Sequence, residues 1–404
     1  MGLSRSRLLS LTIRAAIGSG LACLIACGMA SESTLADRST GPDNEATDGG
    51  GSQSPSTGAD ASPGAPTGSG VVLVHAARFP SLRLCFENYP DLRPLPDATI
   101  MPEANRVGLE VGSVVRLPPF ATAPGKVYVI DRIRASATTG ENEKTCRERI
   151  ECADGQTTNC CPKNTPGCLR RGADFLEAGA ISDPLGNGRV DVLAITGCSN
   201  QIIDPGTGAL ECDTKDVKWD ALRGNLLQKH FSLFPNAAAT NDKLPVQLVH
   251  LSSQIDTYRA GGALDVTFGK LSNGGAKLEQ SVAEGPVLFE PAKQATLTVK
   301  QDETAFFGEN GFRITIGGNP AITIDQSLAD VQNLSSPSDL PTTYYQAASN
   351  YALLLLGDPR VSVDGGTPDE RTSVHLLAIP IVEPTSADAG ADSGSTDLPL
   401  GDGG

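Results

Sequence analysis

Two five-residue stretches decide how this chain is organised: VVLVH at residues 71–75 and VQLVH at residues 246–250. Both follow the pattern Val-x-Leu-Val-His. Each is followed further along the chain by an apolar run that ends in glycine, VDVLAITG at 190–197 and YALLLLG at 351–357. The histidine and the closing glycine are 122 residues apart in the first half (197 minus 75) and 107 apart in the second (357 minus 250). Similar landmarks at similar spacing predict one structural module used twice.

Short strand-like segments lie between these landmarks. They are β-branched or alternate between apolar and polar residues, and Gly, Pro, Asn or Asp bounds them. Short strands at such spacing predict an all-β fold built from β-sandwiches. Besides the landmark runs, the predicted strands are residues 81–86, 113–117, 126–133, 264–268, 295–300, 312–316 and 374–381.

Helical patterns are few. Residues 217–231 place Leu222, Leu226 and Leu227 near Trp219, a spacing that predicts a helix. Residues 342–351 are a second, weaker candidate. We expect the first helix to bridge the two modules or to pack on one edge.

The ends of both halves resemble those of an uncharacterised family of bacterial envelope proteins. In that family an immunoglobulin-like module opens with V-x-V-x-H-A-S-P and closes with a Tyr-containing strand that ends in Gly-Asp. The second half matches through LVHLSS (248–253), LDVTFG (264–269) and YALLLLGD (351–358), followed by VHLLAIP. The first half departs from the pattern, with HAARFP at 75–80 and a closing TGC at 196–198. The resemblance implies two tandem immunoglobulin-like β-sandwich modules, and it implies no activity because the family has none established.

The N-terminus has the features of an export signal. Arg5, Arg7 and Arg14 precede an apolar run at 15–26 that is too short for a permanent membrane-spanning helix. The run ends in Leu-Ile-Ala-Cys27, which resembles the lipobox of bacterial lipoproteins, where the cysteine after the cut receives the lipid. Cys23 competes, but Gly20 stands where that family prefers Leu. An ordinary signal peptide with incidental cysteines is the alternative.

Lipid attachment at Cys27 predicts a protein of the cell envelope whose partner is a membrane, reached through its N-terminal lipid. Gly28 follows the cysteine, where Asp commonly retains proteobacterial lipoproteins in the inner membrane. By resemblance, we expect the outer membrane or the cell surface.

Composition divides the rest of the chain. Residues 28–70 are rich in Ser, Gly, Ala, Asp, Pro and Thr and hold no aromatic residue, so these 43 residues are expected to form a disordered tether with a reach on the order of 35 Å. The full predicted division is a signal peptide at 1–26, a tether at 27–70, a first module at 71–213 with a Cys-rich insertion at 145–172, a helical connector at 214–244, a second module at 245–384, and a disordered tail at 385–404.

The chain carries 32 basic and 47 acidic side chains, a formal charge of −15. It therefore lacks the basic footprint that nucleic-acid binding requires. The acidity is spread over tether, tail and folded part alike, which is typical of a soluble surface rather than of a cation site.

Eight cysteines remain once Cys23 leaves with the signal and Cys27 is lipidated. An even number in an exported protein predicts four disulfides, but eight cysteines allow 105 pairings. The adjacent pair Cys160 and Cys161 is not expected to bond to itself. A zinc site in the Cys-rich insertion is disfavoured because the segment lacks a repeated C-x2-C knuckle and any His. The disulfide candidates are Cys85, Cys146, Cys152, Cys160, Cys161, Cys168, Cys198 and Cys212.

Catalytic and metal motifs are missing from the sequence. No G-x-S-x-G, H-E-x-x-H or P-loop motif occurs, and the stretch 183–191 lacks the oxygen ligands of an EF-hand, so it is interpreted as a turn before a strand. His75 and His250 recur at equivalent places, and a structural role explains both without a metal. A hidden pair of carboxylates, as in glycosidases, stays open.

These observations favour a non-enzymatic lipoprotein that presents loops to another envelope protein or to a polysaccharide, without a cofactor. The Cys-rich stretch, above all 147–171, is the first candidate for the contact surface, because binding residues tend to lie on loops held by a rigid scaffold. Two alternatives remain: an envelope glycan hydrolase that uses an unrecognised carboxylate pair, and a structural spacer.

Overall fold

The computed structural model describes residues 69–97, 100, 108–131, 144–203, 210–213, 219–220, 222–233, 242–271, 278–300, 302–337, 339–345, 350–363 and 371–381. All of them belong to one compact unit, residues 57–404. The predicted signal peptide, the tail, nearly all of the predicted tether and Cys27 lie outside the described residues. The described part is mostly β, with several sheets and short helices, as the strand pattern predicts.

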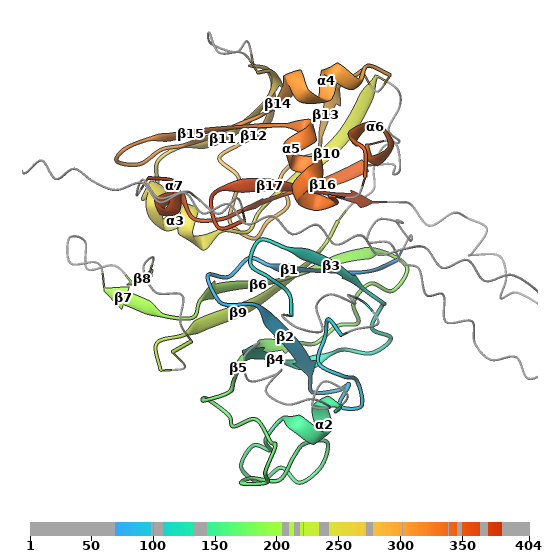
Figure 1. Cartoon of the computed structure of the whole chain (residues 1–404), viewed down its shortest axis with the longest axis vertical. Coiled ribbons are helices and arrows are strands. Elements are labelled where there is room, and N and C mark those ends of the chain that lie inside the picture. The colour runs from blue at the N-terminus through green and yellow to red at the C-terminus, as the bar shows by residue number, and fades with distance from the viewer. Residues whose placement is uncertain are drawn as a thin grey trace, which may run out of the picture. The chain divides into compact units, whose positions relative to one another are not determined.

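The first half contains two sheets (Figure 1). In one sheet, β1 (Gly70–His75) lies between β3 (Val114–Leu117) and β6 (Val190–Cys198), and β9 (Asn225–Ser232) follows β6 at the edge. In the other, β4 (Gly125–Asp131) lies between β2 (Leu82–Phe86) and β5 (Phe175–Ile181). A two-stranded hairpin, β7 (Gln201–Ile203) and β8 (Leu210–Cys212), follows β6.

The second half repeats this connectivity. β10 (Lys243–His250) lies between β13 (Ala295–Thr298) and β16 (Asn350–Leu356), with β17 (His375–Ile381) beyond β16. The facing sheet has the order β12 (Leu278–Glu284), β11 (Leu264–Lys270), β14 (Asn310–Ile316), β15 (Ile322–Ser327). In both halves the opening strand pairs in parallel with the later glycine-ended strand, β1 with β6 and β10 with β16. Every strand predicted from the sequence is confirmed as to place, with ends that differ by a few residues.

The helices are short. They are α2 (Cys146–Arg149), α3 (Ser253–Arg259), α4 (Thr304–Glu309), α5 (Leu328–Ser335), α6 (Pro341–Tyr344) and α7 (Pro359–Val363). Among the described residues, none is both long and apolar enough to cross a bilayer. The weaker predicted helix at 342–351 is correct only in part, because α6 ends at Tyr344 and β16 already begins at Asn350.

The prediction of a helix at 217–231, and with it a helical connector at 214–244, is wrong. Residues 225–232 form β9, which pairs antiparallel with β6 along its whole length. Leu226 is buried while Leu227 is 42% exposed, an alternation typical of a strand. Leucines at this spacing suit a helix as well as a strand, and the unpaired edge of β6 decides between them by supplying hydrogen-bond partners. The first module therefore extends past residue 213, and β10 begins at Lys243, before the predicted start of the second module at 245.

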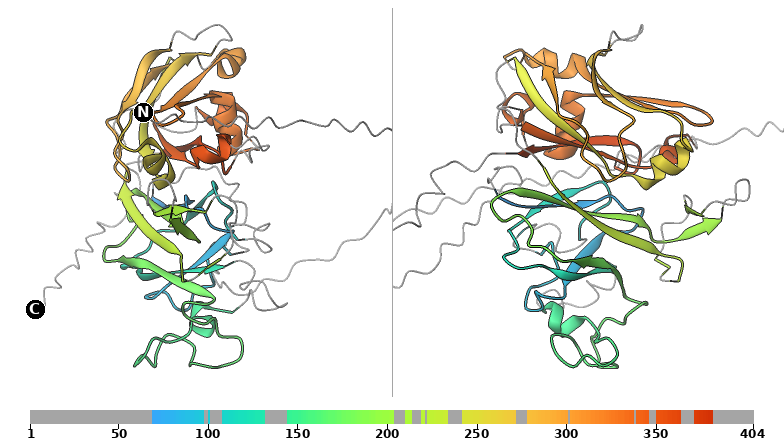
Figure 2. Two further views of the ribbon diagram at one scale, coloured as in Figure 1. Left: turned by 90° about the vertical axis from the view of Figure 1, so that its left-hand side faces the viewer. Right: turned by 180° about the vertical axis from the view of Figure 1, so that it is seen from behind.

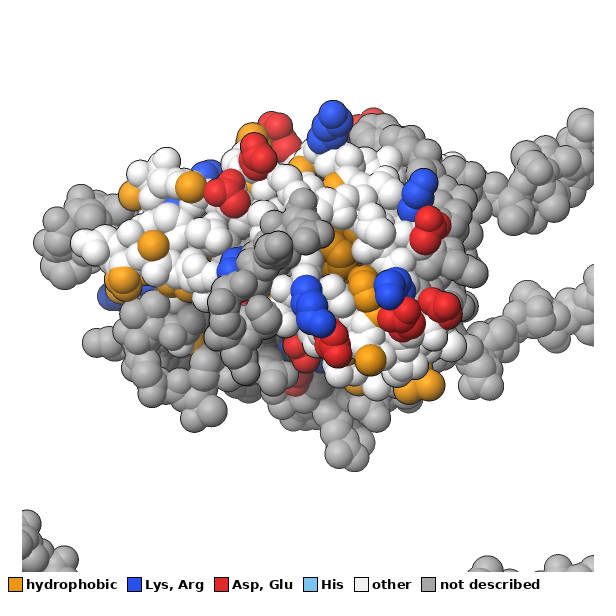
Figure 3. All heavy atoms as spheres, turned by 90° about the horizontal axis from the view of Figure 1, so that it is seen from above, with side chains coloured by type: hydrophobic (Ala, Val, Ile, Leu, Met, Phe, Trp, Pro, Cys, Tyr) orange, Lys and Arg blue, Asp and Glu red, His pale blue; other side chains and the backbone are white. Residues whose placement is uncertain are grey.

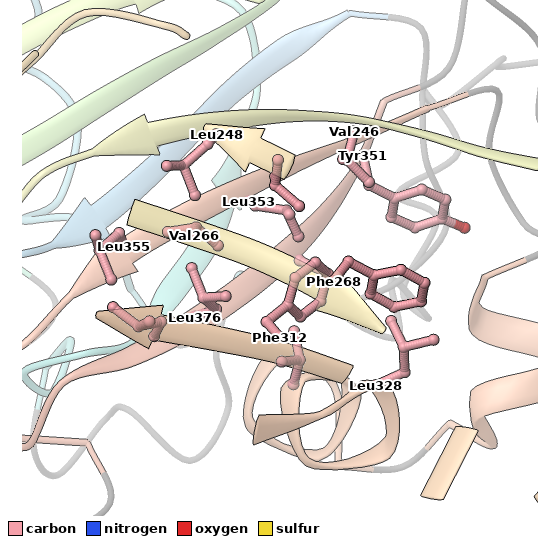
Figure 4. Close-up of a cluster of buried hydrophobic side chains, with 14 of the residues drawn as sticks. Val246, Leu248, Val266, Phe268, Phe312, Leu328, Tyr351, Leu353, Leu355 and Leu376 are labelled. Carbon is pink, nitrogen blue, oxygen red and sulfur yellow. The ribbon is translucent and has the colours of Figure 1, made fainter. Parts of the chain in front are cut away.

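The central strands are buried on both faces because the sheets stack in four layers (Figure 2). Along β16, Tyr351, Leu353 and Leu355 face the core of the second half, shown in Figure 4. The alternate residues Ala352, Leu354 and Leu356 join a separate cluster with residues of β1 and β6. Successive side chains of a strand point to opposite faces, so a strand covered on both sides reads as an uninterrupted apolar run.

The glycines that close β6 and β16 have the same structural role. Gly197 and Gly357 have φ angles of 94° and 92°. A Cβ added to Gly197 would overlap the carbonyl oxygen of Asn225, and one added to Gly357 would overlap that of Ser373. In both halves this glycine has a positive φ and lies against the backbone of a neighbouring segment, which explains why both apolar runs end in Gly.

We expect Gly357→Ala to lower the free energy of unfolding by about 2 kcal/mol, because it combines an unfavourable φ with a backbone clash. Urea unfolding of the full chain measures the change. Gly308→Ala in α4 is the matched control: its Cβ meets nothing within 4 Å, and alanine in a helix is expected to be neutral or stabilising by up to about 1 kcal/mol. Equal losses in the two variants would contradict this account.

Candidate functional site

The structure pairs the eight cysteines into four disulfides. The bonds are Cys85–Cys146, Cys152–Cys160, Cys161–Cys168 and Cys198–Cys212. Cys160 and Cys161 bond to different partners, as predicted from their adjacency. Three of the four bonds hold the Cys-rich insertion, and Cys85–Cys146 fixes its first helix, α2, to β2 in the core of the first half.

The Cys-rich insertion lies at the end of the first half that is remote from the second (Figure 1). Four of its five basic side chains are paired with acids: Arg147 with Asp91, Lys163 with Asp154, Arg170 with Asp174 and Arg171 with Glu177. The exposed stretch between them is mainly Thr, Asn, Pro and Gly. The insertion is thus a stapled, polar loop. The one pocket that its residues line among those found in the described residues lies where it meets β2 and β4 and has a volume of only about 10 Å³.

The repeated histidines are buried. His75 contacts the carbonyl oxygen of Pro80 through Nε2 at 3.1 Å, and burial lowers its pKa to about 4. His250 Nε2 lies 3.5 Å from Asp256 Oδ1, at the outer limit of hydrogen bonding. The contact with His250 lowers the pKa of the Asp256 carboxyl, and Arg259 lowers it further by a smaller amount. His375 is also buried and contacts Ser373 O, whereas His230 is exposed on β9. No group of three or more His, Cys, Asp or Glu that could hold a metal ion is found within the described ranges.

The stretch 183–191 forms a turn, as predicted. Asp191 is buried at the start of β6 and accepts hydrogen bonds from Gly186 N at 2.7 Å, Arg189 Nε at 2.9 Å and Ser232 Oγ at 2.7 Å. These bonds tie the turn and β9 to β6. The carboxylate of Asp191 makes structural hydrogen bonds, which agrees with a turn better than with a calcium-binding loop.

The two halves meet at an apolar interface bordered by polar contacts. Arg78 forms an ion pair with Asp358 at 3.1 Å, and Arg360 forms one with Glu211 at 2.5 Å. The cavity beside Arg78 and Asp358 has a volume of about 40 Å³, enough for a few water molecules. It is too small for a sugar or a peptide.

A much larger cavity lies in the second half, where β12 and β13 form the edges of the two facing sheets. Its volume is about 470 Å³, within the range of small-molecule sites. We call this cavity the edge slot; residues 280–287 and 290–296 line it. At one end the amide of Gln280 on β12 donates to Thr296 O and accepts from Thr298 N at 3.3 Å. This side chain pairs with the edge of β13 as another strand would, and so joins the two sheets beside the slot.

Hydrogen-bonding groups of several kinds line the edge slot. Glu284, Glu290 and Lys293 are exposed there, and Gln294 is half-buried. The side-chain nitrogen of Gln294 is buried and has no hydrogen-bond partner among the described residues. A buried amide donor without a partner costs free energy that a bound acceptor can offset. The slot therefore combines two carboxylates, an ammonium group and two amides, and one of these amides, Gln294, has a nitrogen without a hydrogen-bond partner.

Sequence reasoning missed the edge slot. The residues come from two strand edges and the long connection between them, and none belongs to a motif. The available signal was weak: the connection AEGPVLFEPAKQA (283–295) carries several polar side chains between two predicted strands. Only the pairing of β12 and β13 with different sheets brings these side chains around one space.

Charge is mixed over the surface of the second half. Figure 3 shows acidic and basic side chains interspersed on the face that it displays. Lys270–Glu309, Lys300–Glu303 and Arg313–Asp325 are exposed pairs of this kind. Comparisons of the chain with protein-family models, with curated proteins and with solved structures give no match, so the assignment of a function begins from the chemistry of the edge slot.

Proposed function

We propose that this protein is a lipid-anchored lipoprotein of the cell envelope that binds polysaccharide through the edge slot, without catalysis. The export signal and the lipobox around Cys27 support the anchoring and the outer-membrane or cell-surface location. Two packed sheets in each half support β-sandwich modules of the immunoglobulin-like type implied by the resemblance. The observation that carries the binding proposal is the polar lining of the one large cavity among those found in the described residues.

The chemistry of the slot fits a glycan better than a protein. Sugar hydroxyls both donate and accept, and the slot offers acceptors at Glu284 and Glu290 and donors at Lys293 and Gln294. Protein partners bind over broad surfaces and rely on buried aromatic and arginine anchors. The edge slot is concave, and none of its lining residues is aromatic. Phe289, which stands between the two lining stretches in the sequence, lines a different groove with Leu210 and Leu227.

Binding is tested by isothermal titration with two defined sets of soluble oligosaccharides, neutral hexose oligomers and N-acetylhexosamine oligomers. We expect the double variant Gln294→Ala/Glu290→Ala to weaken binding at least tenfold, because it removes one amide and one charged partner. The control Gln228→Ala/Glu309→Ala changes the same residue types on β9 and α4 and is expected to leave the affinity unchanged. Failure of both sets to bind, or equal loss in the control, would refute the proposal.

Hydrolysis is a second candidate, favoured by one observation: Glu284 and Glu290 line the same cavity. Glycosidases use two carboxyl groups on either side of the scissile bond. The release of reducing ends from bound oligosaccharide separates the two functions. If the protein only binds, the oligosaccharide stays intact; turnover that is lost in Glu284→Gln, with binding retained, would establish the hydrolase.

A further inference from the structure

Four of the large apolar side chains that are exposed among the described residues lie on or near the β7–β8 hairpin. Ile203 and Leu210, 68% and 63% exposed, are directly paired across the hairpin. Leu222 is 96% exposed in the turn before β9, and this turn bonds to the hairpin through Gln201 N and Arg223 O at 3.1 Å. Leu227 on β9 is 42% exposed and lines one groove with Leu210. These four residues form what we call the hairpin patch.

The hairpin is held firmly at its base, and Ile203 and Leu210 are the last described residues of its two strands. The disulfide Cys198–Cys212 joins its base to β6. Glu211 pairs with Arg360, and Gln254 Nε2 contacts Cys212 Sγ at 3.0 Å. Figures 1 and 2 show the hairpin below α3, standing away from the sheets of the first half. Exposed apolar groups on a fixed projection mark a contact surface, since soluble proteins rarely leave such a group uncovered.

The side-chain types of the hairpin patch and the charges beside it indicate what kind of partner it contacts. All four side chains are aliphatic, whereas the anchors of protein interfaces are mostly Trp, Tyr and Arg, and Leu is uncommon among them. The charges beside the patch are internally paired, Arg223 with Asp220 and Arg360 with Glu211. An aliphatic surface whose described neighbouring charges are paired suits the hydrocarbon boundary of an uncharged bilayer better than a charged or aromatic-rich protein.

The predicted anchor brings such a bilayer within reach. The chain between Cys27 and Gly70 spans at most roughly 150 Å. Because β1 and β6 run parallel, the hairpin lies at the opposite end of their sheet from Gly70, a strand length of about 30 Å away. A tethered site meets its target at a high effective concentration, so even a weak apolar contact becomes populated.

We propose that the hairpin patch inserts into the surface of the bilayer to which the lipid at Cys27 attaches, and so orients the folded part on the membrane. The proposal rests on the lipid anchoring proposed above and is independent of the edge slot. Contact through the patch would add a second, reversible attachment to the membrane beside the covalent lipid.

The test uses the full mature chain with Cys27→Ser, so that no lipid masks a weak contact, and vesicles of phosphatidylcholine at millimolar lipid. We expect it to sediment with the vesicles to an extent that does not change with salt, because apolar contact is not screened. Adding Ile203→Ser/Leu210→Ser is expected to weaken partitioning about 100-fold, roughly tenfold for each aliphatic side chain lost. The control Leu340→Ser removes a leucine that is 69% exposed in the second half, and is expected to change partitioning less than about twofold.

Three results would overturn the proposal. The Cys27→Ser chain could fail to sediment with the vesicles; the hairpin variant and the control could lose binding equally; or sedimentation velocity could show a dimer that disappears in the hairpin variant, which would assign the patch to self-association. Unchanged thermal unfolding shows that the variants are folded. Oligosaccharide titration of the same variants separates this proposal from the edge slot, because the hairpin changes should leave glycan binding intact.

Discussion

Replacing Cys85 and Cys146 together with alanine is expected to lower the free energy of unfolding by about 4 kcal/mol. The bond spans a sequence separation of 61, and a crosslink that closes a long loop restricts the unfolded chain most strongly. Both cysteines are also buried in a cluster with Tyr128, Ile150 and Phe175 that connects the insertion to the first half. Urea unfolding of the full chain, with the other three disulfides intact, measures the loss.

The matched control is Cys161→Ala/Cys168→Ala. This bond lies in the same insertion but spans a separation of only 7, so the same reasoning gives a loss of about 2 kcal/mol. Cys161 is buried, but the loop residues 162–167 that the bond closes are exposed, so less packing is lost than at Cys85–Cys146. A control that is as damaging as the Cys85–Cys146 variant would show that loop length does not govern the contribution of these crosslinks.

Acidification is expected to destabilise the protein through His75 by about 3 kcal/mol between pH 6.5 and about pH 4. Burial lowers the pKa of this imidazole from 6.5 to about 4 in the folded protein. Below pH 6.5 the unfolded chain therefore binds a proton that the folded chain does not, and stability falls as pH falls until both states are protonated below about pH 4. Each pKa unit of difference corresponds to about 1.4 kcal/mol.

The measurement is the free energy of unfolding as a function of pH, compared between the native chain and His75→Gln. The variant should show a shallower dependence across this window, whatever its absolute stability. Carboxylates such as Asp256 also lose stabilising contacts in acid, so the difference between the two curves isolates His75. His230→Gln, at an exposed position on β9, should retain the native slope. Parallel curves for native protein and His75→Gln would rule out the assignment.

The two proposed contacts place different demands on the fold. The edge slot depends on the separation of β12 and β13 at the edges of facing sheets, and the hairpin patch depends on the crosslinked base of β7 and β8. The edge slot and the hairpin patch both lie on elements that are fixed to the sheets, by the Gln280 hydrogen bonds and by the Cys198–Cys212 disulfide. Such fixed elements lose less entropy on binding. One molecule can in this way contact a polysaccharide with its second half while the end of its first half rests on the bilayer.

The sequence by itself determined most of the strands and their double use in two halves, but not β5, β7, β8, β9, β12 or β15. The run Leu353–Leu356 and the opening strands are recognisable because burial on both faces leaves no polar position, and each closing glycine is recognisable because a side chain would meet the neighbouring strand. The number of disulfides also followed from the composition and the predicted export signal. Strand patterns and closing glycines are local features, and the number of disulfides follows from counting cysteines, so a single sequence is enough to predict them.

Only the tertiary structure decided the rest. Residues 225–232 became a strand because β6 offered an unpaired edge, a partner far enough along the chain that leucine spacing could not reveal it. The disulfide pairing, one arrangement among 105, was chosen by which cysteines the fold brought together. Glu284, Glu290 and Gln294 came to line one space, and Ile203 and Leu210 were left exposed, through contacts between distant segments. Binding surfaces of this kind arise from the juxtaposition of strand edges and carry no periodicity or motif, and for that physical reason the sequence indicated the scaffold but not the sites.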